Sequence, residues 1–151
     1  MHSEMPSGTS ISVQGRSSAA ERAFKRILSS LKAYNFSVED VFAVHLGLEE
    51  SFINAVRHGN KSDLNKKVVI TFDIKPDQVE ICLQDQGEGF DPDSIPDPTS
   101  GDNIYKIGGR GLFLIRSYID VTSFNEKGNC ICMVKYNSNC RKSSSKKHAA
   151  K

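Results

Sequence analysis

Residues 85–90 read Asp-Gln-Gly-Glu-Gly-Phe and residues 109–112 read Gly-Arg-Gly-Leu, with a long irregular segment rich in Pro, Asp and Gly between them. The first glycine cluster ends a strand pattern, and the second opens the apolar helical pattern LFLIRSYI. Irregular segments of this length inside a small domain usually have a function or are disordered. The stretch 85–120 therefore marks a strand-to-helix junction.

Strand patterns lie on both sides of this junction. Alternation of apolar and polar residues predicts strands at 11–16, 67–74, 78–85, 121–126 and 130–137. Pro76 lies in the short turn between the second and third of these, and Gly128 lies in the turn between the last two. Strands joined by such turns form hairpins, so the sheet is antiparallel or mixed.

Helical spacing of apolar residues accounts for most of the remaining chain. Helices are predicted from Ser17 or Ser18 up to Asn35, from Ser37 to Gly59-Asn60, and over 112–119. Ser37 stands at an N-cap position, and Asp40 stands where a capping box places its acid. Long helices must cover one face of the sheet, so we predict an α+β two-layer sandwich with a mixed, mostly antiparallel sheet.

Length and charge predict one domain with polar ends. A chain of 151 residues is long enough for a single core. The segment 141–151 holds five basic residues and no acid, so the rest has 15 basic and 18 acidic side chains and a net charge of −3. We expect a disordered tail at 1–10, a folded domain at 11–137 and a basic disordered tail at 138–151, which could alternatively contact nucleic acid.

The sequence predicts a cytoplasmic protein with reduced cysteines. No apolar run approaches the ~20 residues of a membrane span, and residues 1–10 lack the apolar core of an export signal. The four cysteines, Cys82, Cys130, Cys132 and Cys140, include no C-x-x-C pair. Cys130 and Cys132 lie two residues apart, which is poor geometry for a disulfide. We therefore expect free thiols and no zinc site.

The second predicted helix carries a narrow polar band. Glu50, Asn54 and His58 recur at four-residue spacing beside the small residues Ala43 and Gly47. A solvent-exposed face would explain such a band, although exposed helix faces more often carry Lys and Glu pairs. Small residues beside a carboxylate and an amide indicate that something packs closely there. Oxygen atoms one turn apart also suit a hard divalent cation.

The two glycine clusters predict contacts with a flat, phosphorylated ligand. Strand alternation points the Asp85 carboxylate inward, where it needs a hydrogen-bond donor such as an adenine amino group. Gly87 and Gly89 would let the backbone approach a flat ligand closely. Gly109 and Gly111 precede a helix, and backbone amides at a helix start favour phosphate.

Taken in order, these motifs resemble a known family. Glu50-x-x-x-Asn54-Ala-Val-x-His-Gly is similar to the N box of the GHKL (Bergerat-fold) ATPases, Asp85-x-Gly87-x-Gly89-Phe to the G1 box, and Gly109-Arg-Gly-Leu-x-Leu-Ile to the G2 box. The small size and the short segment between the two glycine clusters resemble the anti-sigma factor serine kinases of bacterial stress and sporulation switches. The resemblance covers residues 11–137 and implies that they form an ATP-binding domain.

The resemblance implies a role for each motif residue. Glu50 would be the catalytic base that takes a proton from the attacking serine, and Asn54 would bind Mg²⁺ bridging the ATP phosphates. Asp85 would accept a hydrogen bond from adenine. The residues implied to bind ATP are Asn54, Asp85, Gly87, Gly89, Gly109, Arg110, Gly111 and Leu112. Arg110 would offset phosphate charge or alternatively face a partner protein, and Asp91–Ile107 would form a lid over the triphosphate.

The resemblance also implies partners and an activity. The chain would hold a sigma factor inactive and phosphorylate a small STAS-type antagonist on serine, using ATP and Mg²⁺ as cofactors. Neither a membrane nor direct nucleic-acid binding is expected, and a homodimer is possible through apolar residues near Phe24 or Phe36. Two alternatives stay open: a nucleotide-gated binding regulator without phosphotransfer, and a degenerate fold that no longer binds ATP.

Overall fold

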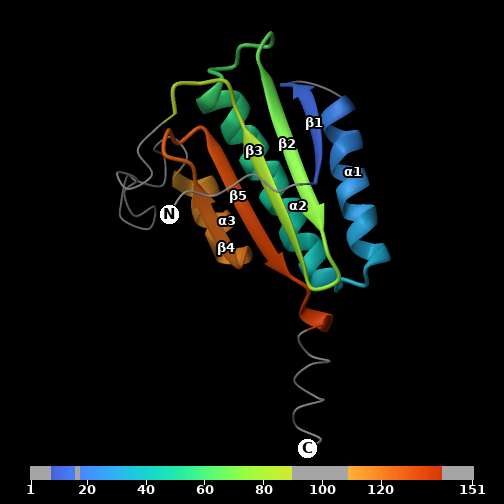
Figure 1. Ribbon diagram of the computed structural model, residues 1–151. Helices are drawn as coiled ribbons and strands as arrows, with labels where there is room; N and C mark the ends of the chain where they lie inside the picture. The colour runs from blue at the N-terminus through green and yellow to red at the C-terminus, as the bar shows by residue number, and fades with distance from the viewer. Residues whose placement is uncertain (1–7, 16–17, 90–108, 141–151) are drawn as a thin grey trace, which may run out of the picture.

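The computed structural model describes residues 8–15, 18–89 and 109–140, with the Gly109 and Arg110 side chains left out (Figure 1). The elements in chain order are β1 (Thr9–Gln14), α1 (Ser18–Ala33), α2 (Val38–Asn54), the π-helical turn η1 (Ala55–Gly59), β2 (Lys67–Ile74), β3 (Gln78–Gln84), α3 (Gly109–Tyr118), β4 (Val121–Phe124) and β5 (Cys130–Tyr136). The predicted succession of strands and helices is confirmed.

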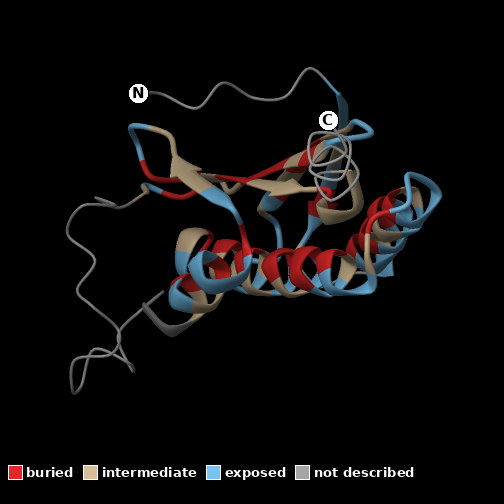
Figure 2. Cartoon of the chain, turned by 90° about the horizontal axis from the view of Figure 1, so that it is seen from below, coloured by how far each residue is buried: buried red, intermediate tan, exposed pale blue. Residues whose placement is uncertain are grey.

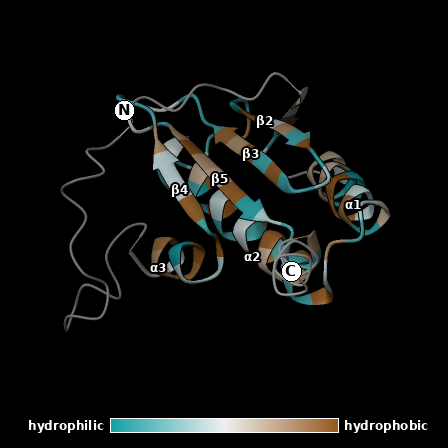
Figure 3. Cartoon of the chain, turned by 60° about the horizontal axis from the view of Figure 1, so that its bottom comes forward, coloured by the Kyte–Doolittle hydropathy of each residue, from teal (hydrophilic) through white to brown (hydrophobic). Residues whose placement is uncertain are grey.

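The sheet has the order β1-β2-β3-β5-β4, and all four strand pairs are antiparallel. Two hairpins, β2-β3 and β4-β5, therefore lie side by side, and β3 pairs with β5 across the long segment that contains α3. Figures 1 and 3 show α1, α2 and α3 on the same side of this sheet. The predicted α+β two-layer architecture is confirmed, with antiparallel pairing throughout the described strands.

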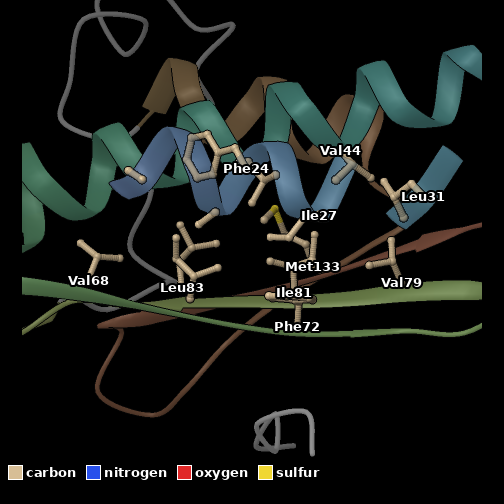
Figure 4. Close-up of a cluster of buried hydrophobic side chains, with 14 of the residues drawn as sticks. Phe24, Ile27, Leu31, Val44, Val68, Phe72, Val79, Ile81, Leu83 and Met133 are labelled. Atoms are coloured by element: carbon tan, nitrogen blue, oxygen red, sulfur yellow. The ribbon is translucent and has the colours of Figure 1, made fainter. Parts of the chain in front are cut away.

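The core lies between the two layers. Figure 4 shows Phe24, Ile27 and Leu31 of α1 meeting side chains of the sheet, among them Ile81 and Leu83 of β3. Ile27 and Leu31 are fully buried because they occupy the inward stripe of α1 at four-residue spacing. Figure 2 shows the buried positions on the facing sides of the helices and the sheet. No helix in the described part of the chain is long and apolar enough to cross a bilayer.

Local signals set the ends of the helices. Asn35 takes a left-handed φ of 61°, a conformation that asparagine tolerates, and it ends the α1 region. Ser37 then caps α2 by accepting a hydrogen bond from the Asp40 backbone N–H at 3.1 Å, as predicted. The Asp40 carboxylate accepts hydrogen bonds from the N–H and hydroxyl of Ser138 at 2.9 and 2.8 Å. This buried acid therefore ties the end of the described chain to α2.

The described chain differs from the sequence prediction at both of its ends. Strand β1 begins at Thr9, which pairs with Phe72, inside the segment expected to be a tail. Ser138 is held by Asp40, although the basic tail was expected to begin there. Residues 1–7 and 141–151 lie outside the described residues. The contacts of Thr9 and Ser138 are tertiary, so their own sequence neighbourhoods carry no signal for them.

The two phenylalanines near which a dimer surface was expected are themselves buried. Phe24 and Phe36 are 5% and 6% exposed, and Phe24 packs edge-to-face against Phe52 at 5.6 Å between ring centroids. Exposed apolar side chains do lie beside Phe36, at Tyr34 and Val38. Phe42 on α2 and Phe113 on α3 are exposed as well, and a dimer through residues near Phe36 stays a prediction.

The expectation of reduced thiols is wrong for two cysteines. Cys82 of β3 and Cys132 of β5 form a disulfide, with their Cα atoms 4.1 Å apart. The two residues lie directly opposite each other in the β3-β5 register. Spacing along the chain indicates only the close pair Cys130 and Cys132, which does not bond. Strand pairing across 50 residues brings together the pair that bonds.

Candidate functional site

The polar band of α2 faces the first turn of α3. A Cβ atom built on Gly111 would lie 2.9 Å from Glu50 Oε2 and 3.2 Å from Asn54 Nδ2. Such a Cβ would be closer to the carboxylate oxygen than real Cβ atoms come, so only glycine fits here without a shift. The structure therefore brings Glu50, Asn54 and Gly111 together, although 57 residues separate Asn54 from Gly111 in the chain.

The small residue Gly47 of the band is explained by β5 and by the residue that follows α3. A Cβ atom on Gly47 would lie 3.1 Å from Sδ of Met133 in β5 and 3.3 Å from Cδ1 of Ile119, which directly follows α3. Gly47 and Ala43 are both buried. The prediction that something packs closely on this face of α2 is confirmed, and the exposed-face alternative fails for this part of the helix.

A π-helical turn ends the helix that carries Glu50 and Asn54. In η1 the Asn60 N–H donates to the Ala55 carbonyl at 2.8 Å, five residues back. Single π turns occur often at functional sites because they redirect a helix end. Here the turn sets Gly59 against the end of β3, where a Cβ atom would overlap the Asp85 carboxylate. The side chain of His58 in the same turn is mostly exposed. The pKa of its imidazole is lowered, mainly because part of the ring is desolvated and to a smaller extent because of the nearby Arg57 charge.

Asp85 follows β3 and is half-buried. Burial raises the pKa of its carboxyl group, while the Gly87 backbone N–H, Lys127 and Lys66 lower it. The Gly87 N–H donates to Oδ1 at 2.7 Å, which leaves acceptor capacity on the carboxylate. A Cβ atom on Gly87 would overlap the Gly59 carbonyl. Gly59 and Gly87 therefore leave no room for side chains around this carboxylate.

Asn60 connects the elements around Asp85, whereas its position in the sequence predicts only the end of a helix. It is 1% exposed. Its Oδ1 accepts from the Gln86 N–H at 2.7 Å, and its Nδ2 donates to the Lys67 carbonyl at 3.1 Å. One side chain thus connects η1, the start of β2 and the chain beyond β3. The only sequence signal is a polar residue directly after His-Gly.

The β4-β5 turn supports Asp85 from the other side. The Asp85 N–H donates to the Asn129 carbonyl at 2.9 Å, and Asn129 Nδ2 donates to the Asp85 carbonyl at 3.3 Å. Gly89 has a φ of +83°, and a Cβ atom there would overlap the Lys127 carbonyl. The first glycine cluster was predicted to need backbone freedom, and Gly89 does: it takes a left-handed φ and lies directly against the backbone of the β4-β5 turn.

The second glycine cluster begins α3. Gly109 and Arg110 form the first positions of the helix, and Leu112 is 4% exposed, so its side chain packs inward. The predicted contact of Leu112 with a ligand can involve only its backbone. The predicted lid, Asp91–Ile107, lies outside the described residues.

The arrangement gathers complementary chemistry from separate parts of the chain. Glu50 and Asn54 supply oxygen atoms, which are the ligands that a hard divalent cation prefers. The start of α3 supplies backbone N–H groups, which favour phosphate. Asp85 supplies a half-buried acceptor beside glycines. A nucleotide with its metal carries the groups that each of these would meet.

Comparison with known proteins agrees with this chemistry. Residues 15–135 match the family described as "Histidine kinase-like ATPase domain". The chain belongs to the histidine kinase-like ATPase domain family. The match covers every described site residue, from Glu50 to Leu112.

Two relatives within this family carry an activity in their names. "Serine-protein kinase RsbW" from Staphylococcus aureus strain MSSA476 is 33% identical over 106 residues, covering 65% of this chain and 67% of the relative. The protein of the same name from strain JH9 matches equally well.

One solved structure supports the fold. The structure of the RsbU and RsbW domains of Rv1364c from Mycobacterium tuberculosis superposes with a TM-score of 0.54 at 14% identity. The alignment covers 85% of this chain and 32% of that one, so this histidine kinase-like ATPase domain spans about a third of the longer protein.

Proposed function

We propose that this protein is an ATP-dependent serine-protein kinase. The observation that carries the proposal is the meeting of Glu50 and Asn54 with the side-chain-free position Gly111. A kinase needs a base for the attacking hydroxyl and a cation ligand beside the phosphates. The relatives named serine-protein kinase support the same activity.

The residues present fit ATP and Mg²⁺. Asn54 Oδ1 would hold the cation, and the N–H groups at the start of α3 would bind phosphate oxygens. Asp85 would accept the adenine amino hydrogen bond through capacity that the Gly87 N–H leaves open. Bound Mg²⁺ would neutralise phosphate charge during transfer. Gly87, Gly89, Gly109 and Gly111 would provide close backbone approach, with Arg110 near the phosphates.

Glu50 is the proposed catalytic base. Its carboxylate would accept the proton of the substrate serine hydroxyl while that oxygen attacks the terminal phosphorus of ATP, whose bond to the bridging β–γ oxygen breaks so that ADP leaves. The geometry supports this role because Glu50 Oε2 lies toward Gly111, on the side where α3 would hold phosphate. Asn54 lies one helical turn after Glu50, so a Mg²⁺ ion bound by Asn54 would lie close to the proposed base.

The proposed substrate is a small STAS-type antagonist protein, and the proposed second partner is a sigma factor that the kinase holds inactive. The resemblance of the motif residues to anti-sigma factor serine kinases supports both partners. A cytoplasmic location and a homodimer belong to the same proposal. Phosphorylation of the antagonist would leave the sigma factor bound, and the unphosphorylated antagonist would release it.

The test uses purified protein with Mg²⁺ and γ-labelled ATP, and STAS-type proteins from the same organism as candidate acceptors. Wild type should label the acceptor on serine. Glu50→Ala should abolish labelling while ATP binding, measured by calorimetry, stays within about twofold. Glu49→Ala is the matched control, since Glu49 is exposed and pairs with His45 at 3.3 Å. Labelling that survives in Glu50→Ala would refute the assigned base.

A nucleotide-gated regulator without phosphotransfer is the second candidate. The exposed apolar residues Val38, Phe42 and Phe113 favour a role in binding other proteins. Under this reading wild type binds ATP and captures the sigma factor, but no acceptor is labelled. Asn54→Ala separates both candidates from a chain that does not bind nucleotide, because it should remove the Mg²⁺ dependence of ATP binding.

A further inference from the structure

A cluster of three sulfur atoms lies outside the proposed site. The Sγ atoms of Cys82, Cys130 and Cys132 all lie within 4.8 Å of one another. The three residues are 1%, 4% and 8% exposed, and they form a buried cluster separate from the main core. The proposed kinase activity uses none of them.

The cluster lies on the face of the sheet away from the helices. Ile81, Leu83 and Met133 point into the core between the layers, as Figure 4 shows. Cys82 and Cys132 alternate with these residues along β3 and β5, so their side chains point the other way. Cys130 lies two residues from Cys132 and therefore shares its face. Two paired strands thus present three sulfur atoms at fixed spacing.

We propose that these three cysteines form a metal site that binds one Cu⁺ ion when the Cys82–Cys132 disulfide is reduced. Thiolate sulfur is a soft ligand and selects soft cations such as Cu⁺. Structural Zn²⁺ sites take four protein ligands. Among the described residues, the cluster offers three ligand atoms and no fourth from His, Cys, Asp or Glu. Three sulfur ligands suit three-coordinate Cu⁺.

The step from disulfide to metal site is balanced. A dithiol reductant supplies two electrons and two protons, which break the Cys82–Cys132 bond and leave two thiols, while the reductant becomes a disulfide. Cu⁺ then forms bonds to sulfur, and the displaced thiol protons pass to solvent.

The position of the site next to Asp85 is a consequence of the strand register. Cys130 lies opposite Gln84, the last residue of β3, and directly follows Asn129, whose carbonyl accepts the Asp85 N–H. The proposed metal site therefore adjoins the nucleotide corner without sharing a side chain with it. Its existence does not depend on the proposed kinase activity.

The test titrates Cu⁺ anaerobically into full-length protein that has been reduced and desalted, in competition with a chromophoric Cu⁺ chelator. Reduced wild type should bind one ion per chain, and disulfide-bonded protein should bind none. Cys130→Ser should weaken binding by more than about tenfold. Cys140→Ser is the matched control, since Cys140 lies outside the cluster, and it should match wild type. Equal binding by the Cys130 variant, or loss in the Cys140 variant, would overturn the proposal.

A second measurement needs no variant. Reduced wild type is alkylated with and without Cu⁺, and the tryptic peptides are analysed by mass spectrometry. Cu⁺ should protect Cys82 and the peptide 128–135, which holds Cys130 and Cys132, but should leave Cys140 reactive. Uniform labelling of all four cysteines would overturn the proposal, as would protection by Zn²⁺ but not by Cu⁺.

Discussion

Asn60→Ala should destabilise the protein and weaken nucleotide binding together. The substitution removes the acceptor for the Gln86 N–H and the donor for the Lys67 carbonyl, at 2.7 and 3.1 Å. The first bond holds the chain that leads from β3 to Gly87, and the second ties the Asn60 side chain to the start of β2. The fold should survive, since the main core lies between the layers and does not include Asn60.

The magnitude follows from the two orphaned backbone groups. A buried group that loses its partner costs about 1–3 kcal/mol. Gln86 and Lys67 are exposed residues, so water can partly replace the lost partner, and the lower part of that range applies. Two groups together should cost about 2–3 kcal/mol. With a urea m-value of about 2 kcal/mol/M, the unfolding midpoint should fall by about 1–1.5 M.

The assay is urea unfolding followed by far-UV circular dichroism, since the chain has no tryptophan. Asn65→Ala is the matched control: Asn65 is exposed in the same connection, and its loss should cost less than about 0.5 kcal/mol. ATP affinity of Asn60→Ala is measured in parallel. A destabilisation below about 1 kcal/mol with an unchanged m-value would refute the reasoning about Asn60. Lost stability with unchanged ATP affinity would show that Asn60 does not position Asp85.

Three further predictions concern the glycines and the aspartate of the site. Gly111→Ala should lower Mg-ATP affinity by about threefold, or about 0.7 kcal/mol, because its Cβ would lie 3.2 Å from Nδ2 of Asn54, the proposed Mg²⁺ ligand, and that side chain must shift. Calorimetry measures this, and unchanged affinity would remove Gly111 from the site. Gly89→Ala should lower the free energy of unfolding by about 1–2 kcal/mol, because φ is +83° and the Cβ would overlap the Lys127 carbonyl. An unchanged free energy of unfolding in urea would contradict the left-handed conformation. Asp85→Asn should raise stability at neutral pH while weakening ATP binding. Burial raises the folded-state pKa of Asp85, so its ionisation costs stability as pH rises through that pKa, and the gain should vanish below the unfolded value of 3.8. A gain that persists at pH 3 would contradict this origin.

Several site residues could be predicted because their signals are local. Glu50 and Asn54 lie one turn apart on a single helix, so helical periodicity alone puts them on one face. Asp85 directly follows an alternating strand, which indicates the side to which its carboxylate points. Gly87 and Gly89 are recognisable because glycine clusters at strand ends mark tight backbone paths.

Other features could not be predicted because they depend on contacts between distant segments. Asn60 can be buried because it hydrogen-bonds to the backbones of Lys67 and Gln86. Nothing in the sequence around either residue predicts this contact. Phe42 on α2 is exposed although the next two residues, Ala43 and Val44, are buried, and which of these apolar residues meets the core depends on the neighbouring elements. The disulfide escaped notice because its two cysteines meet only through the β3-β5 register.

By itself, the sequence determined which elements form and which residues are candidates for the proposed chemistry, since periodicity, capping and glycine placement act over a few neighbouring residues. Only the tertiary structure decided what each of those residues meets: Gly111 against Glu50, Gly59 against Asp85, and Cys82 against Cys132. The physical reason is that hydrogen bonds, steric exclusion and sulfur chemistry act over a few ångströms of space. Folding brings into that range residues that lie tens of positions apart along the chain.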